Sequence, residues 1–222
     1  YADVAKAMRI GLQSRTVPSI AIDYIGDGPM VIFLHGIGGD RSTWAHQLVA
    51  FAKAGYCAVA WDARGYGGSD DYDGPLSFTD IADDLARVID AFAVNKAHIV
   101  GTSMGGRISL EFFANHSDRL ATLTLAGVHT SFGHFSPEKQ QAFVAARSKP
   151  LIEDGLEPAD IAPEAISRLA GPNVSDDARS RAIDAASRLH KHTYIKTVEA
   201  TTQFDREHVL GEIDVPTLVI GG

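Results

Sequence analysis

Five short apolar runs alternate with longer amphipathic stretches along this chain, and that alternation restricts the fold more than any other feature. The runs are Met30–Leu34, Cys57–Trp61, Ala97–Val100, Leu120–Ala126 and Thr217–Ile220. Runs this short and this apolar are typical of strands buried on both faces of a parallel sheet, and the stretches between them are typical of crossover helices. Residues 19–25 mix apolar and polar side chains, which predicts an early strand near an edge of the sheet. The sequence therefore predicts an α/β fold.

The stretch Asp80–Phe92 has the clearest helical pattern. Its apolar side chains recur at helical spacing on one stripe, formed by Ile81, Leu85, Val88, Ile89 and Phe92. Thr79 is the predicted N-cap, and three carboxylates crowd the first turns, where the helix dipole favours anions. These carboxylates, Asp80, Asp83 and Asp84, also raise the alternative of a metal site. We favour a solvated helix start, because no histidine or further carboxylate stands at ligand spacing.

Strand patterns are missing between about residues 129 and 204. Ser136-Pro137 is typical of an N-cap followed by proline at the first helical position, and Ser175 opens another helical stretch. We therefore expect residues 1–128 to form the first part of an α/β core and residues 129–204 to form an inserted helical cap. Residues 205–222 then return to the core with its last strand.

Composition limits the partners and the compartment. The 222 residues include 20 Lys+Arg and 28 Asp+Glu, a net charge of −8, which disfavours nucleic acid and anionic membrane surfaces as partners. No apolar run approaches the roughly 20 residues of a membrane span. Cys57 is the single cysteine, so neither an internal disulfide nor a thiolate metal cluster is expected. A reducing, cytoplasmic compartment is the prediction. The oligomeric state is left open.

The segment Gly101-Thr102-Ser103-Met104-Gly105-Gly106 carries the strongest chemical signal. It follows a predicted buried strand and precedes a helical stretch, which is the setting of a nucleophile elbow. Glycines on either side permit the sharp turn that exposes Ser103, and the start of the helix directs the amide of Met104 toward a developing oxyanion. The alternative is a glycine-rich turn that only allows close packing of helix on strand.

A second glycine-rich turn, His35-Gly36-Ile37-Gly38-Gly39-Asp40, follows the first apolar run. It lacks the Gly-Lys-Ser/Thr of a phosphate-binding loop and the glycine spacing of a dinucleotide fingerprint. It can instead aim the amide of Ile37, or that of Gly38, toward the same space as Ser103. Two such donors would form an oxyanion hole. We expect His35 to brace this turn rather than to act as a base.

Taken together, these motifs resemble the α/β-hydrolase fold family in order and spacing. The resemblance also rests on the segments Trp61-Asp62-Ala63-Arg64-Gly65-Tyr66-Gly67-Gly68-Ser69 and Ile213-Asp214-Val215-Pro216-Thr217-Leu218-Val219-Ile220-Gly221. Within the family, the elbow is similar to those of 3-oxoadipate enol-lactonases, small carboxylesterases, cofactor-free haloperoxidases and carbon–carbon bond hydrolases. The resemblance implies a mostly parallel sheet flanked by helices, with a helical cap. It also implies that Asp62 and Arg64 brace a loop.

The resemblance further implies an acyl-transfer cycle without cofactor or metal. Ser103 attacks the carbonyl of a small ester or lactone, the amides of Ile37 and Met104 hold the oxyanion, and water releases the acyl-enzyme. Serine at the elbow, in place of aspartate, argues against the dehalogenase and epoxide-hydrolase branches. Three insert arginines, Arg147, Arg168 and Arg188, are candidates to receive a substrate carboxylate, but solvation is favoured for each.

The catalytic acid and histidine are not found where the family places them. In the family both follow the strand predicted at residues 217–220, so we expect the working protein to continue past Gly222 and to supply them there. Inside the chain, His129 is expected to line the pocket and is the reserve candidate for the base. Asp205, Glu207 and His208 lead into the last strand, so they are expected at the opposite edge of the sheet from Ser103. His98 faces the same objection.

Three functions follow as hypotheses. The favoured one is a serine hydrolase of esters or lactones. The second keeps the fold and the elbow but catalyses carbon–carbon bond hydrolysis or perhydrolysis. The third is a ligand-binding protein on the same scaffold with little turnover, because a fold alone does not fix a function.

Overall fold

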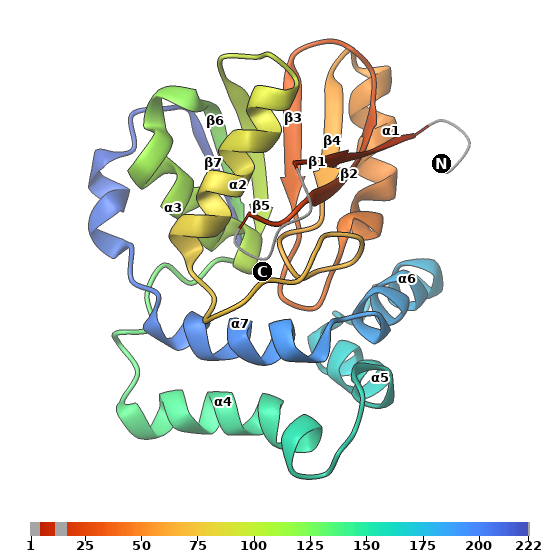
Figure 1. The fold of residues 1–222 in the computed structure, drawn as a ribbon, viewed down its shortest axis with the longest axis vertical. Coiled ribbons are helices and arrows are strands. Elements are labelled where there is room, and N and C mark those ends of the chain that lie inside the picture. Colours follow the sequence, from red (N-terminus) through yellow and green to blue (C-terminus); the bar gives the residue numbers. More distant parts are fainter. Residues whose placement is uncertain (1–4, 12–16, 222) are drawn as a thin grey trace.

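A computed structural model describes residues 5–11 and 17–221. The described residues form a seven-stranded sheet in the order β1-β2-β4-β3-β5-β6-β7 (Figure 1). Its strands are β1 (Lys6–Ile10), β2 (Ile20–Ile25), β3 (Met30–Leu34), β4 (Cys57–Trp61), β5 (Ala97–Thr102), β6 (Leu120–Ala126) and β7 (Thr217–Ile220). Strands β4, β3, β5, β6 and β7 are parallel, whereas β1 and β2 pair antiparallel at one side. The predicted α/β sheet is confirmed.

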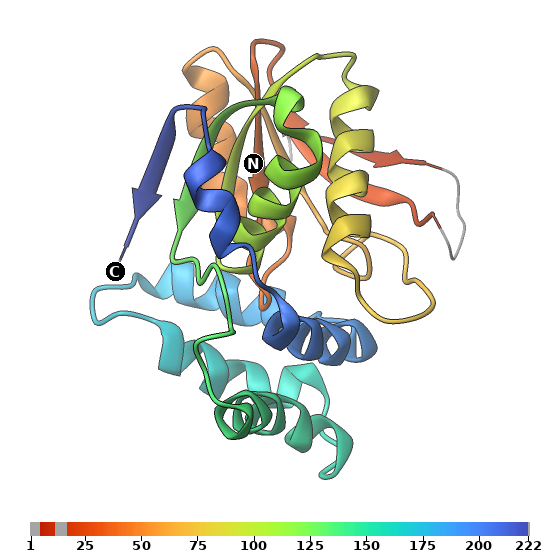
Figure 2. The same cartoon turned by 90° about the vertical axis from the view of Figure 1, so that its left-hand side faces the viewer.

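Helices cover both faces of this sheet. Helix α1 (Ala45–Lys53) lies on one face, and α2 (Phe78–Ala91) and α3 (Met104–His116) lie on the other (Figures 1 and 2). Short 3₁₀ turns, η1 (Arg41–Trp44), η2 (Ser117–Arg119) and η3 (Glu207–Glu212), join the elements. Strands β3 and β4 are buried along their whole length, so apolar side chains on both of their faces pack against helices. This double burial is why these strands are continuous apolar runs.

The predicted strands are found with one omission, but the burial expected for residues 217–220 is wrong, because all four residues of β7 are exposed. Four of the five apolar runs have the predicted bounds, and β5 continues from Val100 to Thr102. Strand β2 lies one position inside the edge, because β1 pairs with it along Lys6–Ile10 and forms the edge itself. The sequence pattern gave no signal for β1, in which only Ile10 is buried. No described helix is long and apolar enough to cross a membrane.

Two predictions about the start of α2 are wrong. The N-cap is Ser77, whose extended backbone lets its hydroxyl accept from the amide of Asp80 at 3.2 Å. Thr79 lies inside the helix and donates to Glu111 of α3 at 2.7 Å. The carboxylates are not all solvated either, because the side chain of Asp84 is only 1% exposed and accepts two hydrogen bonds from Arg64.

Four helices form a block between β6 and β7 in the chain: α4 (Pro137–Ile152), α5 (Pro158–Leu169), α6 (Asp176–Ser187) and α7 (Lys191–Gln203). Ser136 and Ser175 cap α4 and α6 through their side chains, as predicted. The block, here called the insert, lies beyond the carboxyl ends of the parallel strands (Figure 1). Ligands bind at this end of open α/β sheets.

The two ends of the insert meet in a short paired neck, formed by residues 130–132 and 204–206. The amide of Phe132 donates to the carbonyl of Phe204 at 3.1 Å, and the amide of Arg206 donates to the carbonyl of Thr130 at 2.9 Å. Ser131 and Asp205 form an isolated antiparallel bridge between them. The chain therefore leaves the sheet and returns to it at one place, which Figure 2 shows beside α3.

Candidate active site

Ser103 stands at the turn between β5 and α3 with a strained backbone. Its φ of 50° and ψ of −110° are rare for a residue other than glycine, and strain of this kind collects at functional sites. The turn needs its flanking glycines. A Cβ on Gly101 would stand 2.4 Å from the carbonyl oxygen of Gly105, and a Cβ on Gly105 would stand 2.2 Å from that of Leu34. This is the geometry of a nucleophile elbow.

The start of α3 presents backbone donors beside Ser103. Ser103 is the N-cap residue of α3, and Met104 is the first residue of the helix. Because the first amides of a helix have no intrahelical acceptor, they are available to an anion held at the helix start. The carbonyl of Ser103 accepts from the amides of Gly106 and Arg107 at 3.1 and 3.2 Å, which fixes the first turn.

The turn after β3 lies against the elbow. The amide of Gly39 donates to the carbonyl of Gly36 at 3.0 Å and closes the turn that contains Ile37 and Gly38. At Gly36, a Cβ would be 3.5 Å from the Cβ of Ser103, so this turn and the elbow are in van der Waals reach. The structure thus brings the predicted turn and Ser103 together.

The side chain of His35 holds this turn in place. Its Nε2 accepts from the amide of Ala63 at 3.1 Å, so its proton sits on Nδ1, which donates to the carbonyl of Gly36 at 2.8 Å. The side chain is fully buried, and burial lowers its pKa below 6.5 despite the opposing effect of Asp62. Both ring nitrogens are engaged with the backbone, so His35 holds two loops together and has no free nitrogen for Ser103.

Asp62 and Arg64 fix the loop after β4. The buried carboxylate of Asp62 accepts from the amides of Arg41 and Gly68, each at 2.7 Å, and forms an ion pair with the Arg41 side chain. Arg64 extends from the same loop to Asp84 of α2, with its Nε 2.6 Å from Oδ2. Each charge is met by a partner of opposite charge, as buried charges require. These contacts agree with the bracing role expected from the resemblance.

Helix α7 of the insert packs next to the elbow. The hydroxyl of Tyr66 lies 3.0 Å from Oγ1 of Thr197 and 3.7 Å from the sulfur of Met104. Tyr66, Met104 and Thr197 of α7 are all buried. Tyr66 thus joins the loop after β4, the first residue of α3 and the insert at one point.

A family model described as the alpha/beta hydrolase fold matches residues 29–222. The chain belongs to this family. It is 31% identical over 202 residues to 2-hydroxy-6-oxononadienedioate/2-hydroxy-6-oxononatrienedioate hydrolase from Burkholderia vietnamiensis, covering 86% of this chain and 69% of that protein. It is 25% identical over 227 residues to 3-oxoadipate enol-lactonase 1 from Acinetobacter baylyi, covering 99% of this chain and 80% of that protein. The resemblance stated from the motifs is confirmed.

The fold is similar to that of solved hydrolase structures. A thermophilic esterase from Thermogutta terrifontis in its malate-bound form superposes with a TM-score of 0.84 at 24% identity, covering 98% of this chain and 80% of that one. The curated relatives and the family together identify this α/β hydrolase as an enzyme of the hydrolase class.

Within the described residues, no hydrogen bond joins Ser103 to any of the other histidines of this hydrolase. His129 is exposed, its ring lies beside Phe132 and Phe135 with centroids 6.4 Å away in each case, and its carbonyl accepts from Arg107. His98 is the second residue of β5, near the amino end of the strand, and its Nδ1 lies 2.8 Å from Oγ1 of Thr122.

The placement predicted for the segment after the insert is wrong. Asp205 belongs to the neck beside Ser131, and Glu207 lies 2.8 Å from Nε2 of His134, so both stand on the insert side of the sheet. The chain returns to the start of β7 only afterwards, through η3, which contains an exposed His208. Adjacency in sequence to a strand did not fix the sheet edge, because a connecting turn spans the distance.

The three insert arginines have different surroundings. Arg168 is exposed and pairs with Glu164 on its own helix, which agrees with solvation. Arg147 is half-buried, stacks on Phe143 at 3.7 Å, and has its pKa lowered by burial. Arg188 donates to Asp40 of the core at 2.7 Å, while 52% of its side chain is exposed, so it is solvated and also paired with the core.

A buried arginine in α3 was not predicted from the sequence. Arg107 donates to the carbonyl of His129 at 3.1 Å and lies 3.3 Å from Oγ1 of Thr201, so it ties α3 to both ends of the insert. Burial lowers its pKa to about 10. No sequence pattern predicts this role. Most residues of α3 are buried, so the helix has no separate polar face on which a charged residue would be expected.

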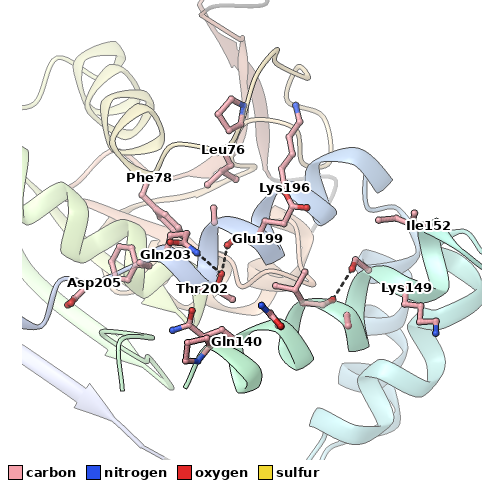
Figure 3. A pocket seen from close by; sticks show the side chains of 18 of the residues that line it. Leu76, Phe78, Gln140, Lys149, Ile152, Lys196, Glu199, Thr202, Gln203 and Asp205 are labelled. Carbon is pink, nitrogen blue, oxygen red and sulfur yellow. Dashed lines mark hydrogen bonds between the residues drawn. The ribbon is translucent and has the colours of Figure 1, made fainter. Parts of the chain in front are cut away.

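A large cavity of about 860 Å³ lies between the insert and the core (Figure 3). Its walls come from α4, α7, the start of α2 with the segment before it, Glu111 of α3 and residues 204–206 of the neck. Ser103, Ile37, Gly38, Met104 and His129 are not among its lining residues. This cavity is therefore separate from the elbow. No group of three or more His, Cys, Asp or Glu side chains suited to a metal ion occurs in the described part of the chain.

Proposed function

We propose that this hydrolase cleaves small esters or lactones through an acyl-enzyme on Ser103. The observation that carries the proposal is the strained backbone of Ser103, at φ 50°, held between a strand and the start of a helix. Proteins maintain such strain where the surrounding structure enforces it, and at an elbow its effect is to project the hydroxyl. The enol-lactonase and esterase among the compared proteins support this substrate class.

In the proposed reaction, Ser103 Oγ bonds to the substrate carbonyl carbon and the carbonyl oxygen becomes an oxyanion. The amides of Ile37 and Met104 donate to that oxygen, and each such donor is worth on the order of 3 kcal/mol in the transition state. Collapse of the oxyanion breaks the bond to the alcohol oxygen, and the alcohol leaves with the proton taken from Ser103. Water then attacks the acyl carbon, which releases the carboxylic acid and restores the Ser103 hydroxyl. A base must take the hydroxyl proton, and His35 is excluded from that role by its two backbone contacts.

The insert is proposed to act as a cap over this site. Its helix α7 already contacts Tyr66 next to Met104, at the carboxyl end of the strands. A cap so placed excludes water from the acyl-enzyme and selects the acyl group by the side chains it presents. Gly38 and His129 are proposed to border the substrate pocket.

A cytoplasmic location is proposed on the cysteine chemistry. Cys57 is free and buried, and the chain contains no second cysteine. Folding of the described core therefore needs no oxidising compartment.

The test is covalent labelling of the protein with an ester-like phosphonate, followed by peptide mapping, in parallel with turnover of a short-chain nitrophenyl ester. We expect labelling at Ser103, and we expect Ser103→Ala to lower kcat by at least about 10³-fold with an unchanged circular dichroism spectrum. A Ser103→Ala variant that keeps a tenth of the activity would refute the assignment.

The same assays separate the alternative functions. Turnover of a carbon–carbon substrate such as a vinylogous diketone, without ester turnover, would identify the second hypothesis. Labelling of Ser103 without turnover of either substrate would identify a binding protein.

A further inference from the structure

One contact joins the insert to the turn that is proposed to hold the oxyanion. Arg188 follows the last residue of α6, and its Nη2 lies 2.7 Å from Oδ2 of Asp40 and 3.1 Å from Oγ of Ser42. Asp40 is almost buried, with 7% of its side chain exposed, whereas 52% of Arg188 is exposed. Arg188 therefore links the end of α6 to a carboxylate that belongs to the core.

Asp40 is the residue on which the turn ends. Its Oδ1 accepts from the amide of Ser42 at 2.9 Å and caps η1, while its carbonyl accepts from the amide of Thr43 at 3.1 Å. One carboxylate oxygen thus fixes the chain after the turn, and the other fixes the insert. Burial raises the pKa of Asp40, but the bonds from Ser42 and Arg188 outweigh it, so the pKa lies below 3.8.

The turn itself has two anchors. On one side His35 holds the carbonyl of Gly36, and on the other side Asp40 holds η1. Ile37 and Gly38 lie between these anchors, and nothing within 4 Å would meet a Cβ on Gly38. The His35 anchor meets the insert through an intermediate side chain, because its ring lies 4.8 Å from that of Tyr66, whose hydroxyl bonds to Thr197 of α7. The Asp40 carboxylate is instead bonded directly by Arg188 of the insert. The direct contact between the insert and the turn is therefore the one at Asp40.

We propose that Arg188 is a positioning residue that couples the seating of the insert to the oxyanion turn through Asp40, an inference that rests on the proposed function. With the insert seated, Arg188 holds the carboxylate and the amide of Ile37 faces Ser103. With the insert displaced, Asp40 loses its cationic partner and the turn loosens. A cavity of about 220 Å³ beside the pair, lined also by Arg41 and Gly68, leaves space for that movement.

The test compares Arg188→Met with a matched control, Arg168→Met, in the full-length protein. Arg168 is also an arginine of the insert, but it is exposed and pairs with Glu164 on α5. We expect Arg188→Met to lower kcat for a short-chain nitrophenyl ester about tenfold and to change KM less than about twofold, because the turn acts in the transition state. We expect hydrogen–deuterium exchange of residues 36–40 to become faster. The control should match wild type in both measurements.

Three further variants sharpen the test. Arg188→Lys keeps the charge and should recover part of kcat. Asp40→Asn is made alone and combined with Arg188→Met, and the double variant should be no worse than the more impaired of the two single variants. Unchanged kcat and exchange in Arg188→Met would overturn the coupling, as would a change confined to KM. Failure of the proposed function is a different result, namely no phosphonate labelling of Ser103 in wild type. Exchange at residues 36–40 then decides the coupling alone.

Discussion

Removal of the Asp84 carboxylate tests the interior ion pair that fixes the loop after β4. Asp84→Ala takes away both hydrogen bonds to Arg64, at 2.6 and 2.9 Å, and the contact to Arg87 at 2.5 Å. Arg64 stays in place with only 7% of its side chain exposed and one remaining carboxylate, Asp80, which is 55% exposed. Breaking a buried pair by removing one partner costs about 3–5 kcal/mol, because a buried charge is left uncompensated.

For a chain of 222 residues, each kcal/mol corresponds to about 2–4 °C in Tm, so we expect Asp84→Ala to lower Tm by about 6–20 °C. Asp83→Ala is the matched control on the same helix, because its carboxylate is 59% exposed and forms a surface ion pair with His116. A surface pair of this kind contributes at most about 1 kcal/mol. Thermal and urea unfolding followed by circular dichroism measure both. Equal losses in the two variants would refute the argument.

Two more predictions concern the elbow and its brace. Gly105→Ala places a methyl group 2.2 Å from the carbonyl oxygen of Leu34, so we expect it to lower the free energy of unfolding by about 1–3 kcal/mol and to remove most of the esterase activity. The control is Gly171→Ala, which has open space around it and should change neither stability nor activity. Burial lowers the pKa of His35 below 6.5. Below pH 6.5 this histidine therefore binds a proton more readily in the unfolded chain than in the folded one. The free energy of unfolding should therefore fall as pH drops through this range, by up to about 1.4 kcal/mol per pH unit, and urea titrations of His35→Asn should lack this share of the slope.

The centre of the sheet was predictable because β3 and β4 are buried on both faces. Residues 30–34 and 57–61 have no polar side chain, and a run of that kind in a chain with intervening helices fits few other structures. Strand β1 was not predicted, because four of its five residues are at least partly exposed and so form no apolar run. The elbow was equally predictable, since its glycines are required by the close approach of backbone to backbone.

Side-chain partners were harder to predict than backbone elements. Asp84 stands three residues after Ile81 and four before Val88, on the apolar stripe of its helix, and that position was the available sign of its burial. Its partner Arg64 lies 20 residues earlier in another element, and only the folded chain brings the two together. The contact of Arg188 with Asp40 spans 148 residues, which no local pattern encodes.

Because the neck joins Ser131 to Asp205, the insert can be exchanged as a unit. Both attachment points lie side by side, so a helical segment of another length could be grafted between them without moving a strand. Closing a loop that is twice as long costs only about 0.6 kcal/mol more. Descent with insertion or deletion at this junction can therefore diversify which molecules are admitted to the elbow, while the sheet, Ser103 and the turn of Ile37 are inherited unchanged.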